Sequence, residues 1–270
     1  MAADLVITPG GPRPADQVHE VKPGNVVDRH GGHLRVLDQK GEVVADLGPV
    51  RERRTRTHRT LPHEIATPLT GTHGLGSGWI TYAYWENNTG QLVSNIITTW
   101  TVPPAPTTNH GQIIYLFNGM EDANLNYIVQ PVLQWSGGAW TVASWYVDGS
   151  TLVAKSPDTT VSVGQVLVGG ITWTNPGTYL CGFQNIPNSA LVVKSMPELT
   201  WVFQTLETYY CQAASDYPNT PDTRMKDIGV DVGNTAQPAT SLSWTAENVI
   251  TDIGQNTFIV NNSEVDIYYT

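Results

Sequence analysis

The stretch YIVQPVLQWSGGAWTVASWYVD, Tyr127–Asp148, decides the fold, because it predicts two strands joined by a tight turn. Val, Ile, Trp and Tyr on either side of the turn favour a pleated, half-buried surface. Side chains alternate along a strand, so Gln130 and Gln134 project from one face. Two long amides and Pro131 on a strand suited to burial are a local inconsistency of the kind found at functional sites. The alternative is an exposed face that happens to carry glutamines.

The chain after residue 78 predicts an all-β domain. Short segments rich in β-branched and aromatic residues alternate with turn signals about every ten residues, and no long amphipathic helix is evident. This pattern is typical of an antiparallel two-sheet β-sandwich or a barrel. The nine Trp supply a large core, and some are expected to line a groove.

Residues 1–78 differ sharply from residues 79–270, and we expect an N-terminal arm followed by a β-sandwich domain. All 9 Trp, 11 Tyr and 4 Phe lie after residue 78. Residues 1–75 hold 10 of the 14 Lys+Arg and 9 of the 24 Asp+Glu, so the arm is weakly basic and the rest strongly acidic. Six of the seven His also lie in the arm. A small hairpin is predicted around Gln39–Glu42, and Arg51–Arg59 is either a cleavable linker, an electrostatic clamp on the acidic domain or a solvated loop.

The composition excludes several functional classes. A formal net charge of -10 makes nucleic acid and anionic membranes poor partners. No run of 18 apolar residues predicts a membrane span, and the N-terminus lacks the apolar core of a secretory signal. We therefore expect a cytoplasmic or non-classically secreted protein, or one numbered without its signal. Cys181 and Cys211 leave a disulfide open, and no metal or cofactor motif is evident.

Several segments, taken in order, resemble the glutamic peptidases of the eqolisin family over about Trp79–Leu206. The resemblance rests on IITTWTVPPAP, IYLFNG, IVQPVLQW, ASWYVD, VSVGQVL and LTWVFQTL. It implies a concanavalin-like β-sandwich and an acid endopeptidase that needs no metal or cofactor. In that family a glutamate is the general base on a water, and a glutamine polarises the carbonyl. The resemblance places the glutamine at Gln130 and the glutamate position at Gln204.

Gln204 departs from the family pattern, because an amide cannot accept the proton of a water. Loss of a general base typically costs about 10²–10⁴ in rate. Glu207, three residues further on, is expected on the opposite face of the strand. Other expected carboxylate positions are also neutral, at Asn118, Gln134 and Ser144.

Two functions follow from these residues. The first is a glutamic-peptidase-like scaffold that acts on polypeptides, with activity impaired or lost and with the arm as a prosegment released in acid. The second is a carbohydrate-binding, lectin-like sandwich with an amide- and Trp-lined groove for a glycan. A protein-interaction role without a small ligand is a third alternative, and core packing is the alternative for each Trp. Both sites require Gln130 and Gln204 to converge, and the residues expected around them are Asn118, Gln134, Trp135, Ser144, Trp145 and Trp79.

Overall fold

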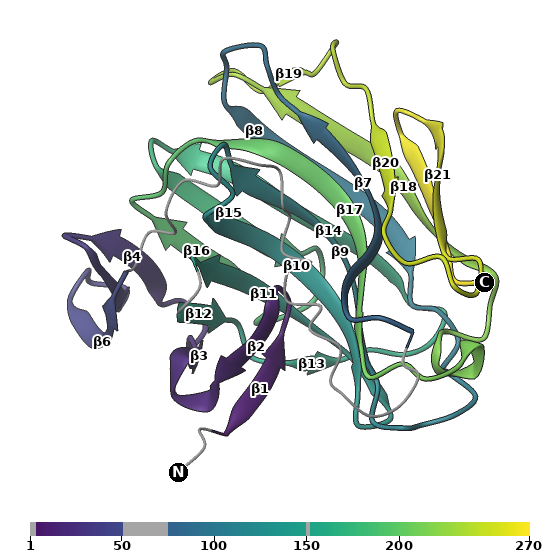
Figure 1. Ribbon diagram of the computed structural model, residues 1–270. Helices are drawn as coiled ribbons and strands as arrows, with labels where there is room; N and C mark the ends of the chain where they lie inside the picture. Colours follow the sequence, from purple (N-terminus) through teal and green to yellow (C-terminus); the bar gives the residue numbers. More distant parts are fainter. Residues whose placement is uncertain (1–3, 51–74, 150–151) are drawn as a thin grey trace.

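The computed structural model describes residues 4–50, 75–149 and 152–270, and it confirms the predicted two-sheet β-sandwich. Two large sheets pack against each other, with a small β1–β2 hairpin beside one of them (Figure 1). Short 3-10 helices at Ala15–Gln17 and Ala214–Asp216 interrupt the strands. No helix in the described part of the chain has the length and apolar character that a membrane crossing needs.

The nine-stranded sheet carries all eight residues of the sequence-predicted site. Its central strands pair antiparallel, and the Tyr127–Asp148 segment forms two of them with the predicted tight turn. In spatial order its strands are β20 (Thr245–Asn248), β7 (Gly78–Glu86), β17 (Leu199–Tyr209), β9 (Ile113–Asp122), β10 (Tyr127–Ser136), β11 (Ala139–Asp148), β12 (Leu152–Lys155) and β3 (Val18–Glu20), with β13 (Thr159–Thr160) also paired to β11.

The eleven-stranded sheet forms the second layer. Its strands are, in spatial order, β21 (Asn256–Asn261), β22 (Glu264–Tyr268), β18 (Asp222–Val232), β8 (Val93–Thr101), β14 (Val166–Asn175), β15 (Thr178–Phe183), β16 (Leu191–Lys194), β4 (Val26–His30), β5 (His33–Leu37) and β6 (Val43–Pro49), with β19 (Gln237–Pro238) also paired to β18.

The nine-stranded sheet buries both of its faces. Its inner face, turned toward the other sheet, contributes residues such as Val129, Leu133 and Val202 to a core shared by both layers. Its outer face carries a separate aromatic-rich cluster that includes Phe117 and Phe203. Because both faces are buried, the polarity of the strands alternates little along the sequence.

Of the described N-terminal strands, β3 to β6 belong to the same two sheets as the aromatic part of the chain, whereas β1 and β2 pair only with each other. Strand β3 pairs in parallel with β12, and β4 pairs in parallel with β16. Arg29 of β4 places its guanidinium 4.1 Å from the ring centroid of Tyr127 and its Nε 3.5 Å from the Asp148 carboxylate. Residue 78 is therefore a boundary of composition, whereas the strands on either side of it share one core. The basic run Arg51–Arg59 lies outside the described residues.

Candidate functional site on the outer face of the nine-stranded sheet

Gln130 lies on the outer face. Its neighbour Val129 is part of the shared core, and the Pro131 ring approaches Gly169 of the other sheet, so both flanking residues point inward. Gln130 is therefore turned outward, opposite Trp145 of β11 in the strand register. It is 1% exposed, and neither of its amide atoms has a hydrogen-bond partner among the described residues. A buried amide without partners is costly, which makes this residue a candidate ligand contact.

Gln204 lies on the inner face, so the expected convergence with Gln130 does not occur. Its Nε2 donates a hydrogen bond of 2.9 Å to the Thr98 hydroxyl on β8, in the opposite sheet. Val202 and Leu206, two residues away on either side, are both in the shared core. The two glutamines thus sit on opposite sides of one sheet, and no water or substrate can bridge them.

Three further residues expected at the site also face inward. Asn118 donates through its Nδ2 to the Gly169 carbonyl at 3.2 Å, and Ser144 donates to the Ser189 carbonyl at 2.6 Å. Trp135 belongs to the shared core, where its ring lies 5.3 Å from that of Trp140. These side chains connect or fill the space between the sheets and line no groove.

Gln134, Trp79 and Trp145 share the outer face with Gln130. The two tryptophans are 1% and 3% exposed; the Trp145 indole N–H has no hydrogen-bond partner within the described ranges, and the Trp79 indole lies beside Glu207 and lowers its pKa. Gln134, half-buried, is two rows along β10 from Gln130. Half of the eight predicted residues therefore share a surface, as strand alternation requires, and half do not.

Glu207 is the main functional candidate that the sequence analysis did not select. It lies on the outer face of β17, opposite Trp79 of β7 and Tyr115 of β9. Its Oε1 accepts hydrogen bonds from the Tyr209 hydroxyl at 2.5 Å and from the backbone N–H of Gly10 at 2.9 Å. Burial raises its pKa to about 7, against the opposing effects of these two donors, of Arg13 and of the Trp79 side chain. The signal in the sequence was the alternation from Trp201 to Tyr209, which puts Glu207 on the face opposite to Gln204.

A second carboxylate lies closer to Gln130. Glu121 of β9 is buried and pairs with Ile128, which is two residues from Gln130 on the same face. Diagonal neighbours of this kind have Cα atoms about 7–8 Å apart. Glu207 lies on the other side of Gln130, in the row of Gln134, about 13 Å from Gln130 in the strand direction.

Phe203 occupies the space directly across from Gln130. Gly119 separates the two in the register, and a Cβ on this glycine would lie 2.2 Å from the Phe203 ring. The absent side chain therefore makes room for an aromatic ring, which lies where a carboxylate would have to stand to face Gln130 across β9.

The N-terminal hairpin β1 (Leu5–Thr8) and β2 (Gly11–Pro14) covers part of this face. Tyr115 donates its hydroxyl to the Ile7 carbonyl at 2.9 Å, and the Ile7 side chain packs on the outer cluster. At the turn, a Cβ on Gly10 would lie 3.9 Å from the Val147 side chain of β11, and Gly10 donates its N–H to Glu207. In Figure 1 the purple hairpin lies over the strands β10 and β11. The occupant of the face in this structure is thus a piece of polypeptide.

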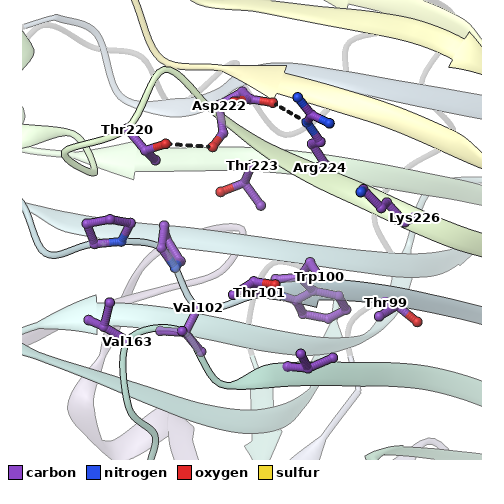
Figure 2. Close-up of a pocket in the computed structure, with 14 residues that line it drawn as sticks. Thr99, Trp100, Thr101, Val102, Val163, Thr220, Asp222, Thr223, Arg224 and Lys226 are labelled. Carbon is purple, nitrogen blue, oxygen red and sulfur yellow. Dashed lines mark hydrogen bonds and ion pairs between the residues drawn. The ribbon is translucent and has the colours of Figure 1, made fainter.

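A cavity of about 440 Å³ lies elsewhere, on the eleven-stranded sheet, where β8 and β18 separate beyond the Thr99–Lys226 pair. Figure 2 shows Thr223 pointing into this cavity and the Asp222–Arg224 ion pair at its rim. None of the eight predicted residues lines it. The described residues also contain no group of His, Cys, Asp and Glu that could hold a metal ion. The outer face of the nine-stranded sheet is therefore the better candidate.

Solved structures of glutamic peptidases share this architecture. Scytalido-glutamic peptidase with a peptide-based transition state analog aligns with a TM-score of 0.54 and 16% identity, over 72% of this chain and 98% of that one. SCP-B, a member of the eqolisin family in complex with the tripeptide Ala-Ile-His, aligns with a TM-score of 0.52 and 16% identity. The alignment again covers 72% of this chain and 98% of that one. The chain has an eqolisin-like fold. No protein-family model matches the sequence, and no curated protein matches it.

Proposed function

We propose that the outer face of the nine-stranded sheet binds a polypeptide, and that the N-terminal hairpin keeps this face covered in a latent state. The observation that supports it is the pair of main-chain contacts from the hairpin, Ile7 carbonyl to Tyr115 and Gly10 N–H to Glu207. Contacts to main-chain groups recognise any polypeptide in the right conformation, and side-chain pockets then select among sequences. The Ile7 side chain in the aromatic cluster is one such selective contact.

Catalysis is the weaker part of the peptidase resemblance. Gln204 is an amide bonded to Thr98 on the inner face, so it neither accepts a proton nor meets a bound peptide. Phe203 stands across from Gln130, and Glu121 is the nearest outer-face carboxylate by register. We therefore propose a peptidase-like scaffold whose hydrolytic activity is impaired or lost, and whose remaining role is to bind polypeptide.

The glycan-binding alternative has less support. Sugar rings stack on open indole faces, whereas Trp79 and Trp145 are buried and Trp135 belongs to the inner core. Among the described residues, no contact on the outer face favours a hydroxyl-rich ligand over the polypeptide hairpin that covers part of it.

Opening the hairpin tests the proposal. Gly10 has a φ of +93° and donates its N–H, so Gly10→Pro removes the hydrogen bond and cannot adopt the backbone angle. We expect fluorescently labelled, denatured casein to bind full-length Gly10→Pro and not the wild type. Gly41→Pro is the matched control, because Gly41 also has a positive φ but lies in the turn between β5 and β6.

Two results would contradict the proposal. If the Gly10→Pro protein is folded and does not bind casein, the proposed polypeptide site is wrong. Retention on polysaccharide columns instead of casein would favour the glycan alternative. Cleavage assays at pH 3–5 with the Gly10→Pro protein, alone and combined with Gln130→Ala or Glu121→Gln, test the impaired-activity part separately. Rapid cleavage would refute it.

A further inference from the structure

The hairpin buries a full positive charge against the outer face. Arg13 of β2 is 3% exposed. Its Nη1 donates to the Pro12 carbonyl at 3.0 Å and its Nη2 to the Gly10 carbonyl at 3.1 Å, while its Nε has no partner among the described residues. A buried guanidinium is costly unless a negative charge lies near it. The hairpin's own carbonyls accept two hydrogen bonds from the guanidinium, but they do not neutralise its charge.

Glu207 supplies the negative charge. Burial lowers the pKa of Arg13, and the charges of Tyr209 and Glu207 act in the opposite direction. Within the described ranges no direct ion pair joins Arg13 to Glu207. Gly10 and Tyr209 donate to one oxygen of this carboxylate, and the Trp79 indole opposite it also favours the charged form, so the negative charge acts on the guanidinium from a short distance.

Resting on the proposed function, we propose that Glu207 forms a subsite for a basic side chain of the bound polypeptide, which Arg13 occupies in cis. Trp79 lies opposite Glu207 in the register, and the rings of Tyr115 and Tyr209 are 6.3 Å apart beside it. Aromatic faces suit the alkyl stem and the planar guanidinium of arginine. The Glu207 carboxylate would then recognise two features of the bound polypeptide. One is a main-chain N–H, and the other is a basic side chain a few residues away in the same segment.

The test uses the full-length Gly10→Pro protein and a labelled peptide with the sequence of residues 4–15, DLVITPGGPRPA. A second peptide carries alanine in place of the arginine, and a third carries citrulline, which keeps the shape and removes the charge. Binding is measured by fluorescence anisotropy to Gly10→Pro alone and combined with Glu207→Gln. Glu247→Gln, an exposed carboxylate on the neighbouring β20, is the matched control.

We expect the arginine peptide to bind at least about tenfold more tightly than the alanine and citrulline peptides. Glu207→Gln should abolish this preference, so that the arginine, alanine and citrulline peptides bind this variant equally well and the two changes are strongly non-additive. Glu247→Gln should have no effect. Peptides that bind equally well with and without arginine, or an arginine preference that survives Glu207→Gln, would overturn the subsite and leave the polypeptide site standing. Absence of binding by every peptide, together with no binding of casein, would instead refute the proposed function.

Discussion

The inner and outer faces of the nine-stranded sheet both bury amides, but they use them differently. On the inner face, Gln204 and Asn118 each donate through the amide nitrogen to a group of the opposite sheet and so hold the two layers together, while the oxygen of each amide has no partner among the described residues. On the outer face, Gln130 has no partner for either amide atom within the described residues. Buried polar groups are nearly always satisfied in native proteins. The comparison teaches that the inner amides connect the two sheets, and it supports the proposal that the outer amide, with neither atom satisfied, contacts a ligand.

The largest loss of folding stability is expected when a carboxylate is placed on the inner face. Gln204→Glu buries an ionisable group between the sheets, where burial raises a carboxyl pKa by about 3 units and ionisation at pH 7 then costs about 4 kcal/mol. Urea unfolding at pH 7 measures this loss, which should shrink below pH 5. Gln130→Glu should cost less, because the hairpin can open to solvate the charge. Gain of proteolysis by Gln204→Glu would contradict the assignment of Gln204 to the inner face.

The next effect concerns Glu207 and pH. Its pKa of about 7 in the folded state lies above the ordinary 4.5, so the folded state binds this proton more tightly than the unfolded state. Stability from this group therefore rises as pH falls from about 7 to about 4.5, by about 3 kcal/mol. Glu207→Gln should remove that dependence, and other titrating groups largely cancel in the difference between the two proteins. Identical pH profiles of thermal stability in wild type and variant would contradict the burial of this carboxyl.

An intermediate loss of folding stability is expected when a side chain is added at Gly119 on the outer face. Gly119→Ala places a methyl group 2.2 Å from the Phe203 ring, and such overpacking typically costs about 1–3 kcal/mol. Phe203→Leu should recover part of the loss in the double variant, which guanidinium unfolding measures. If Gly119→Ala is as stable as wild type, Phe203 does not fill the position opposite Gln130.

The smallest effect is expected at the hairpin. Tyr115→Phe removes only the hydrogen bond to the Ile7 carbonyl, which is typically worth about 1 kcal/mol. Amide hydrogen exchange should quicken in β1 and β2 and stay unchanged in β14, which lies in the other sheet. Uniform acceleration across both sheets would mean that the hairpin does not open as a separate unit.

The sequence predicted the sandwich better than it predicted the site. The turn between Trp135 and Trp140 and the repeated β-rich segments suffice for the architecture, because local pattern decides strands. It did not settle which side chains meet. In LTWVFQTLETY both sets of alternating residues are largely apolar or aromatic, since both faces are buried, so alternation could not tell the inner from the outer set.

The resemblance places the site at Gln204, and strand alternation places Glu207 on the face opposite to Gln204. That face is the one that Gln130 occupies. The pairing of β17 with β9 and β7 decides which residues share a face with Gln130. The spacing of residues within β10 or within β17 does not reveal this pairing.

The most direct test asks which face each glutamine occupies when the hairpin is displaced. Gln130→Cys and Gln204→Cys are introduced separately into the full-length Gly10→Pro protein and reacted with a maleimide. Burial of the native Cys181 and Cys211 raises their thiol pKa to about 12, so they should not react in the folded protein. We predict labelling at position 130 and protection at position 204 until global unfolding. Labelling at 204 with protection at 130, in a folded protein, would contradict the account.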